Sequence, residues 1–417
     1  MKTAGIVAEY NPFHNGHLYQ LKKTKEETGA DFIVIVMSGD FVQRGFPAFL
    51  SKWERVKMAL SCGADLVVEL PTRYATASAE FFAAGAIALL ENTGTDCFCF
   101  GSESGDIRSM EKIADYIHKD CDDFNKAIAQ FTKSGLSYPA ARSQALLSCF
   151  PKNEVSDLSS LLSSPNNILG IEYLKASYRF QSKMTPYTIQ RVCTGYHEAD
   201  ISSASKEQMI INSATAIRNA VQAENNLDPI RQSMPLSALE VLENLPSDLF
   251  PISPDALSDF LFYKLQTTSP EQLTEYMDIS PDFARTIFNK RNNFENFTQF
   301  SQLLKSRQLT QTRINRALLH LILNLKNYTL KGLTAKETVP YVRVLGFRKS
   351  AACIMKRAKE NGIPVITKLA DAKILLSKSA YDMLSEDLFA SALYKRLVFS
   401  QSGIHLPNEF QKTPIIF

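Results

Sequence analysis

The first hundred residues alternate between short apolar runs and longer amphipathic segments. The apolar runs have the length of β-strands and lie at Thr3–Glu9, Phe32–Met37, Leu66–Leu70 and Cys97–Phe100. The amphipathic segments predict helices at His17–Thr28, Ser51–Ser61, Ser78–Glu91 and Ile107–Ile117. Strands and helices that alternate at this spacing predict right-handed crossovers, and therefore an α/β fold around a doubly wound parallel sheet.

Ligands of such sheets bind beyond the carboxyl ends of the strands, close to the point where the strand order reverses. The segments that follow the predicted strands are therefore where we expect the chemistry. They are Glu9–His17, Ser38–Phe49, Pro71–Ala77 and Gly101–Asp106.

The second half of the chain has a different pattern. A proline-rich stretch, Pro235–Ala256, predicts a junction between two domains, residues 1–235 and 236–417. The pattern after it is mostly helical, as in Leu309–Asn327, which has a threonine cap and a leucine face. Ile363–Lys378 predicts a small β-α unit.

The net charge of +3 hides a strong asymmetry along the chain. Residues 281–417 carry 22 Lys and Arg against 9 Asp and Glu, a net +13, which leaves 24 against 34, or −10, for the rest. This asymmetry predicts that the C-terminal third meets a polyanion. A solvated basic face is the alternative, but the excess is spread through helical segments. Between Val339 and Lys368 the cations are Arg343, Arg348, Lys349, Lys356, Arg357 and Lys359.

The sequence argues against a membrane-spanning protein and against a protein held together by disulfides or structural zinc. No apolar stretch approaches the roughly 18 residues that span a bilayer, so no membrane segment is expected. The seven cysteines are an odd number and form no C-x-x-C pair. They predict reduced thiols, no structural zinc and a cytoplasmic location.

The turn after the first strand, "NPFHNGH", contains two of the six histidines of the chain. Gly16 lets the backbone approach a ligand, and a helix N-terminus offers N–H groups that suit phosphate. His14 and His17 could donate hydrogen bonds to phosphate oxygens as negative charge develops in a transition state. Zinc binding is disfavoured because no third ligand lies nearby. A purely structural pair is the other alternative, which the glycine and the position after the strand make less favourable.

The sequence His14-Asn15-Gly16-His17 resembles the H-x-G-H signature of the nucleotidyltransferase-type adenylating folds, which class I aminoacyl-tRNA synthetases share. The longer stretches "GIVAEYNPFHNGHLYQL", "MSGDFVQRGFPA", "GADLVVELP", "FGSESGD" and "SPNNILGIEYL" resemble the bacterial tRNA(Met) cytidine acetate ligases. The likeness covers most of residues 1–220 and is looser beyond. It implies an N-terminal Rossmann-like parallel-sheet nucleotidyltransferase domain, followed by a mostly helical, basic, tRNA-binding region.

The resemblance also implies a reaction. In this family ATP and acetate give acetyl-adenylate, and the acetyl group passes to the exocyclic amine of the wobble cytidine of elongator tRNA(Met), giving N(4)-acetylcytidine. ATP is then the cofactor, and magnesium is expected on the pyrophosphate oxygens, although few carboxylates are free to hold it. No residue is assigned as a metal ligand, and no oligomeric state is inferred.

Site residues follow from the matching motifs. The catalytic set is His14, His17 and Arg218, which act on the phosphates without a protein nucleophile. The nucleotide-binding stretch comprises Val7, Ala8, Glu9, Tyr10, Asn11, Pro12, Phe13, His14, Asn15, Gly16, His17, Leu18, Tyr19 and Gln20. Further nucleotide contacts are implied at Gly101, at Asn166 or Asn167, and at Arg191, Ser213 and Thr215.

The stretch "NSATAIRNA" resembles the second phosphate motif of this fold. Ser213 and Thr215 can cap a helix there and donate to phosphate, with Arg218 facing the same oxygens. Ala214 stands where this motif often carries a second hydroxyl group.

The loop "SGDFVQRGFPAF" has more polar groups than a segment that only connects a strand to a helix would need. Asp40, Gln43 and Arg44 could hold a small carboxylate substrate beside the α-phosphate. Pairing of the aspartate with the arginine to order the loop is an equal alternative.

Two other functions are compatible with parts of the sequence. A small-molecule adenylyltransferase, which would join ATP to a phosphorylated vitamin or nucleotide, needs only the first-domain motifs and leaves the basic C-terminal region unexplained. A nucleotide-binding scaffold without turnover is disfavoured because His14 and His17 are both intact.

Overall fold

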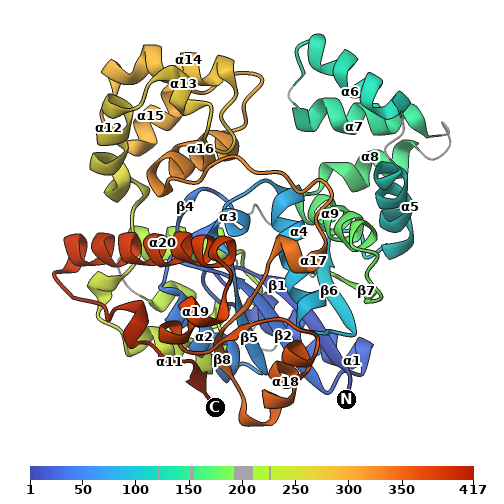
Figure 1. The fold of residues 1–417 in the computed structure, drawn as a ribbon, viewed down its shortest axis with the longest axis vertical. Coiled ribbons are helices and arrows are strands. Elements are labelled where there is room, and N and C mark those ends of the chain that lie inside the picture. The colour runs from blue at the N-terminus through green and yellow to red at the C-terminus, as the bar shows by residue number, and fades with distance from the viewer. Residues whose placement is uncertain (120–121, 137, 151–154, 192–209, 225–226) are drawn as a thin grey trace.

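The computed structural model of the protein describes residues 1–119, 122–136, 138–150, 155–191, 210–224 and 227–417. Its centre is an eight-stranded sheet with the order β10-β8-β5-β2-β1-β6-β7, and β9 pairs with β8 (Figure 1). The parallel strands are β1 (Thr3–Ala8), β2 (Phe32–Ser38), β5 (Leu66–Leu70), β6 (Cys97–Ser102) and β7 (Thr185–Gln190). The predicted parallel α/β sheet is confirmed, and the strand order reverses beside β1.

The pleat of β2 explains why Phe32–Met37 is an uninterrupted apolar run. Ile33, Ile35 and Met37 belong to the hydrophobic core on one face of the sheet, whereas Val34 and Val36 belong to the core on the other face. Both faces are covered by helices, so both sets of side chains are removed from water.

The helices that cover the sheet arise from both halves of the chain. One face packs against α1 (Asn15–Thr28), α2 (Lys52–Ser61), α10 (Ala214–Glu224) and α11 (Leu236–Glu243). The other face packs against α4 (Ala79–Asn92), α5 (Ile107–His118), α9 (Pro165–Arg179) and α18 (Ala352–Glu360). The predicted helices match these elements closely, except that α1 begins two residues earlier than expected.

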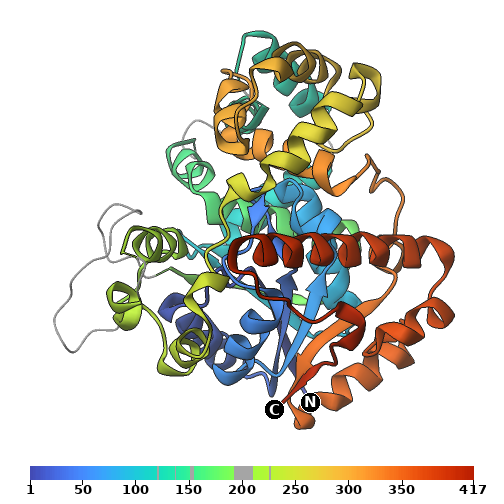
Figure 2. The ribbon, with the colours of Figure 1, turned by 90° about the vertical axis from the view of Figure 1, so that its left-hand side faces the viewer.

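Two groups of helices extend away from the sheet at the same end of the molecule (Figures 1 and 2). The inserted unit, between β6 and β7, contains α6 (Asp122–Lys133), α7 (Tyr138–Cys149) and α8 (Val155–Ser163). The helical unit contains α12 (Ser258–Thr267), α13 (Pro270–Leu273), α14 (Pro281–Lys290), α15 (Phe297–Leu303) and α16 (Gln311–Leu323), and its apolar core continues into the helix Lys378–Ser402.

The chain beyond residue 340 returns to the central sheet. β8 (Val342–Phe347) pairs antiparallel with β5, and β9 (Val365–Ile366) and β10 (Ile415–Ile416) pair with β8. β9 and α19 (Leu369–Leu375) form the predicted small β-α unit. The domain division at residue 235 stays a prediction. The fold adds that the last part of region 236–417 shares a sheet with residues 1–235.

The remaining elements are short, apart from one long helix. They are β3 (Phe41–Val42), β4 (Phe46–Pro47), α3 (Thr72–Ala75), α17 (Ala335–Thr338), α20 (Lys378–Ser402) and the 3-10 helices η1 (Asp228–Ser233), η2 (Ser247–Leu249), η3 (Pro254–Leu257), η4 (Arg291–Asn293), η5 (Lys349–Ala351) and η6 (Glu409–Gln411). Within the described part of the chain, no helix has the length and apolar character that crossing a membrane requires.

A buried ionic cluster joins the N-terminal sheet to the C-terminal segments. Lys52, which is fully buried, lies 2.7 Å from Glu69 and 3.1 Å from Glu409. Arg343 of β8 lies 2.8 Å from Glu69 and also pairs with Glu409. Burial alone would raise the pKa of Glu409, but Lys52, Arg343 and Lys395 hold that pKa well below its ordinary value. Charges this deep are tolerated only when they are paired and hydrogen-bonded.

Candidate functional site

The H-N-G-H turn forms the N-terminal cap of α1. The Nδ1 atom of His14 accepts a hydrogen bond from the Gly16 N–H at 3.1 Å, and the Nδ1 atom of His17 accepts from the His14 N–H at 3.2 Å. This is a reciprocal capping arrangement built from two imidazoles. Because Nδ1 is an acceptor in both rings, the proton of each neutral ring is on Nε2. Neither Nε2 has a hydrogen-bond partner among the described residues.

The surroundings keep both rings neutral. The two imidazoles stack, with ring centroids 3.7 Å apart and planes inclined by 25°. Burial, with the positive charges of Arg191 and Arg218, lowers the pKa of His14 to about 3. Burial and the neighbouring His14 hold the pKa of His17 well below its usual range. The histidines can therefore donate hydrogen bonds to phosphate, but at neutral pH they add no positive charge.

Aromatic side chains hold the His17 ring in place. Tyr10 lies edge-on to it with centroids 4.9 Å apart, and Phe13 lies at 5.5 Å. Both side chains are almost completely buried. Tyr10 adopts a left-handed backbone conformation, with φ of +48°, which is strained for a residue with a bulky side chain. The turn after β1 is thus fixed before any ligand binds.

The second predicted motif lies directly beside this turn. Ser213 caps α10 by accepting a hydrogen bond from the Ala216 N–H at 3.1 Å. Arg218 donates to the Asn11 carbonyl at 2.6 Å and to the Thr215 hydroxyl at 3.0 Å. The structure therefore brings the predicted catalytic residues together, with Arg218 and Arg191 as cations near two neutral histidines.

Asn15, the second residue of the H-N-G-H motif, has a structural role. Its buried Nδ2 donates to the Ile210 carbonyl at 2.9 Å and to the Gln232 carbonyl at 2.8 Å. These bonds tie the start of α1 to the segments on either side of α10. Asn15 therefore supports the site from behind.

A further group of predicted residues lies at the ends of β6 and β7. Gly101 is inside β6, paired with Ile189, and not in the turn after the strand as the sequence predicted. A Cβ atom at Gly101 would meet Arg191 Cγ at 3.4 Å, so the Arg191 side chain runs alongside this glycine. Arg191 donates to the Asn166 Oδ1 at 3.4 Å. Residues 192–209, which follow Arg191, lie outside the described part of the chain.

The choice between Asn166 and Asn167 can be argued from their partners. Asn167 is buried, accepts from the backbone N–H groups of Glu103 and Ser104, and donates to the Leu161 carbonyl. Its oxygen holds the loop after β6, and its nitrogen ties α9 to α8. Asn166 is only half-buried and contacts Arg191 and Glu103. Asn166 is therefore the better candidate for a ligand contact.

The loop after β2 contains the predicted substrate residues, and the structure separates them. Asp40 is buried, where one oxygen accepts the Lys52 N–H and the other accepts the Ser391 hydroxyl, each at 2.8 Å. Both oxygens therefore bind groups inside the protein. The alternative in which Asp40 pairs with Arg44 is not found, because Asp40 contacts Lys52 instead. Arg44 is exposed at the tip of the β3–β4 hairpin, and the Gln43 N–H donates to the Glu9 carboxylate at 2.8 Å.

Arg55 was not singled out from the sequence, although it organises this edge of the sheet. It is completely buried and donates to the carbonyls of Glu9, Ser38 and Gly39, which lie at the carboxyl ends of β1 and β2. The signal in the sequence is that Arg55 lies on the same helix face as the apolar residues of "WERVKMAL", the face that packs on the sheet.

Comparisons with known proteins identify the family of this chain. The family model described as HIGH Nucleotidyl Transferase matches residues 1–405. A protein of Acetivibrio thermocellus named tRNA(Met) cytidine acetate ligase is 35% identical over the full length of both chains. A protein of Caldicellulosiruptor saccharolyticus with the same name is 39% identical, covering 100% of this chain and 98% of its own.

Solved structures give the same result. The crystal structure of Thermotoga maritima TmcAL bound with alpha-thio ATP superposes with a TM-score of 0.89 at 28% identity, covering 100% of this chain and 99% of that one. The apo form of the same protein superposes with a TM-score of 0.90 at 29% identity over the full length of both. The chain therefore belongs to the HIGH nucleotidyltransferase family and, within it, to the group of proteins named tRNA(Met) cytidine acetate ligase.

Proposed function

We propose that this chain is an ATP-dependent acetate ligase, which activates acetate as acetyl-adenylate and acetylates the wobble cytidine of elongator tRNA(Met). The observation that carries the proposal is the pair of neutral histidines on the first turn of α1, whose Nε2 donors have no partner among the described residues. Arg218 lies beside them. This arrangement suits an α-phosphate that gains negative charge during the reaction.

The first step is an in-line displacement at phosphorus. An oxygen of acetate bonds to the α-phosphorus, and the bond to the β-phosphate breaks to release pyrophosphate. His14 and His17 donate through Nε2 to phosphate oxygens, while Arg218 supplies the positive charge. The backbone N–H groups at the start of α1 add a favourable dipole. Positioning and electrostatics account for catalysis, and no covalent intermediate with the protein is needed.

In the second step the cytidine N4 attacks the acetyl carbon, AMP leaves with the bonding electrons of the mixed anhydride, and the nitrogen loses a proton. An exocyclic cytosine amine is a weak nucleophile, so prior activation of the acetyl group makes the step accessible. Asn166 and Arg191, beside Gly101, are our candidates for contacts to the nucleotide at the ends of β6 and β7.

Magnesium would be held mainly by the pyrophosphate oxygens. Among the described residues, no three His, Cys, Asp or Glu side chains converge to form a protein-only metal site. Mg²⁺ often binds through substrate phosphates with one or two carboxylates, and the Glu9 carboxylate is the nearest to the histidine turn in sequence. The ion would screen the charge of the leaving pyrophosphate.

The cellular setting remains a prediction from composition. Cys62, Cys97, Cys99, Cys149 and Cys353 are free cysteines among the described residues, and the prediction of a reducing compartment rests on the number and spacing of cysteines in the sequence. Cys121 and Cys193 lie outside the described residues.

The decisive experiment follows exchange of labelled pyrophosphate into ATP, with and without acetate. Acetate-dependent exchange supports the proposal, and N(4)-acetylcytidine in added elongator tRNA(Met), detected by mass analysis, completes it. Exchange that needs a phosphorylated small molecule in place of acetate would identify an adenylyltransferase. Nucleotide binding without any exchange would identify a scaffold.

A further inference from the structure

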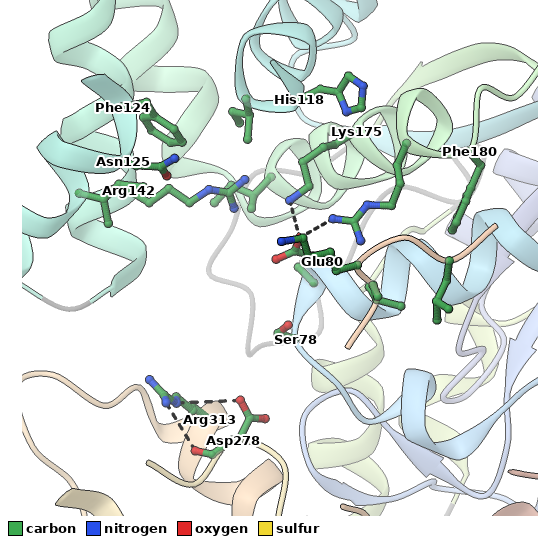
Figure 3. Close-up of a pocket in the computed structure, with 18 of the residues that line it drawn as sticks. Ser78, Glu80, His118, Phe124, Asn125, Arg142, Lys175, Phe180, Asp278 and Arg313 are labelled. Carbon is green, nitrogen blue, oxygen red and sulfur yellow. Dashed lines mark hydrogen bonds and ion pairs between the residues drawn. The ribbon is translucent and has the colours of Figure 1, made fainter. Parts of the chain in front are cut away.

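A large hollow separates the inserted unit from the helical unit (Figure 3). Its volume is about 1170 Å³. We call it the inter-unit groove. Its floor comes from the start of α4 and from Ile168, Lys175 and Arg179 of α9. Its walls come from α5, α6 and α7 on one side, and from α16 and residues 330–334 on the other. Such a volume exceeds what one small ligand needs.

The inter-unit groove is strongly basic. Two carboxylates, Glu80 and Asp278, line it together with six cations, which are Arg142, Lys175, Arg179, Arg313, Arg316 and Lys331. A third carboxylate, buried Glu172, lies 2.5 Å from Arg142 and 2.8 Å from Lys175. Two cations share each of these carboxylates, so ion pairs orient the cations and leave an excess of positive charge.

The ion pairs at the floor and wall illustrate this sharing (Figure 3). Glu80 lies 3.1 Å from Lys175 and 3.3 Å from Arg179. Asp278 lies 2.8 Å from Arg316 and 3.9 Å from Arg313. The Lys331 side chain is exposed and has no ion-pair partner among the described residues. His118 and Phe180 add an exposed and a half-buried ring on which a base could stack.

The other basic region, around α18, is a poorer candidate for a polyanion. Arg348 donates to the carbonyls of Ala64 and Leu60, and Arg357 donates to the Gly94 carbonyl and the Thr3 hydroxyl. Thr3 is the first residue of β1, whereas the histidine turn follows the last residue of that strand. α18 therefore lies near the amino end of β1, at the end of the sheet away from the site, as Figure 1 shows.

Two elements connect the inter-unit groove to the site. α9 begins at Pro165 beside Arg191, and Ile168, one turn later, already lines the groove. Burial lowers the pKa of Arg218, and the charge of Arg44, in the β3–β4 hairpin, acts on Arg218 and lowers that pKa further. The same hairpin packs its Gly45 against the backbone of Arg316, where a Cβ at Gly45 would lie 2.5 Å from the Arg316 nitrogen.

From these contacts we propose that the inter-unit groove binds the phosphodiester backbone of a single-stranded RNA loop, with α18 uninvolved. The inference rests on the proposed function, because it names the surface by which the RNA substrate docks. Lys and Arg side chains that contact phosphates release counterions, which makes binding depend on salt.

The test uses the full chain, a transcript of elongator tRNA(Met), and two triple variants with equal charge change. The groove variant carries Arg179→Gln, Arg313→Gln and Lys331→Gln. The control carries Lys349→Gln, Lys356→Gln and Lys359→Gln, all exposed around α18. In the groove variant we expect tRNA affinity to fall on the order of tenfold or more, and the slope of log affinity against log salt to shrink by about two to three units. The control should keep both.

Acetate-dependent pyrophosphate exchange separates the possible failures. Exchange at the wild-type rate in both variants shows that they are folded. Loss of tRNA affinity in the control, with the groove variant unchanged, would overturn this inference and leave the proposed function standing. A wild-type protein that shows no acetate-dependent exchange would instead overturn the proposed function.

Discussion

The histidine turn and the buried ionic cluster lie at the same edge of the sheet, yet they use polar groups in opposite ways. In the ionic cluster, Lys52, Glu69, Arg343 and Glu409 pair with one another inside the protein. At the turn, His14 and His17 use only one nitrogen each for the protein and keep the other as a donor. Polar groups satisfied internally stabilise the fold, and donors left over are available to a ligand.

The largest effect should come from breaking the ionic cluster. Lys52→Met would leave Glu69 and Glu409 with less compensation in a buried setting, at a cost of about 3–5 kcal/mol in the free energy of unfolding. Denaturant titration measures this cost. The rate of acetate-dependent pyrophosphate exchange per folded molecule should change little. Lys23→Met, on the exposed face of α1, is the matched control. An unchanged unfolding free energy would show that the cluster does not stabilise the protein.

Substitutions in the histidine turn should have the opposite effect: the activity should be lost and the stability kept. His14→Asn retains a side chain that caps helices well but removes the Nε2 donor. We expect acetate-dependent pyrophosphate exchange to fall on the order of a hundredfold, as when one transition-state donor is removed. His17→Ala should lose a similar factor. Near wild-type exchange in both variants would remove these residues from catalysis.

A smaller effect concerns pH. The folded-state pKa of His14 is about 3, below the unfolded value near 6.5, so the unfolded chain binds more protons as the pH falls between these values. This contribution to stability is complete above pH 6.5 and is lost on acidification, by about 1 kcal/mol between pH 6.5 and 5.5. Denaturant titrations at these two pH values should show a shallower dependence in His14→Asn than in the wild type. Equal pH dependence would mean that His14 is not held neutral.

The smallest effect is expected at Gly101. A Cβ atom there meets Arg191 at 3.4 Å, an ordinary contact, so Gly101→Ala should bind ATP almost as the wild type does. Gly101→Val should displace Arg191 and weaken ATP binding several-fold, with tRNA affinity unchanged. Titration calorimetry with ATP compares the two variants. Equal affinity in both would place Gly101 outside the site.

Local sequence determined the parts of this protein that depend on near neighbours. The apolar runs of β1, β2, β5 and β6 predicted the parallel sheet, because strands buried on both faces consist mostly of apolar side chains. The H-N-G-H turn predicted a helix start suited to phosphate. It did not predict that the histidines are themselves the caps, which is why α1 starts earlier than expected.

Only the tertiary structure decided what the charged residues do. Arg343 is one of several cations in its sequence neighbourhood, but its partners Glu69 and Glu409 are far away along the chain, so the sequence cannot distinguish a buried ion pair from a solvated face. The structural role of Asp40 could not be predicted for the same reason, because its partner Ser391 is also far away along the chain. The inter-unit groove collects its cations from α7, α9, α16 and residue 331. Electrostatic interactions depend on distance in space and on burial, and both are set when the chain folds.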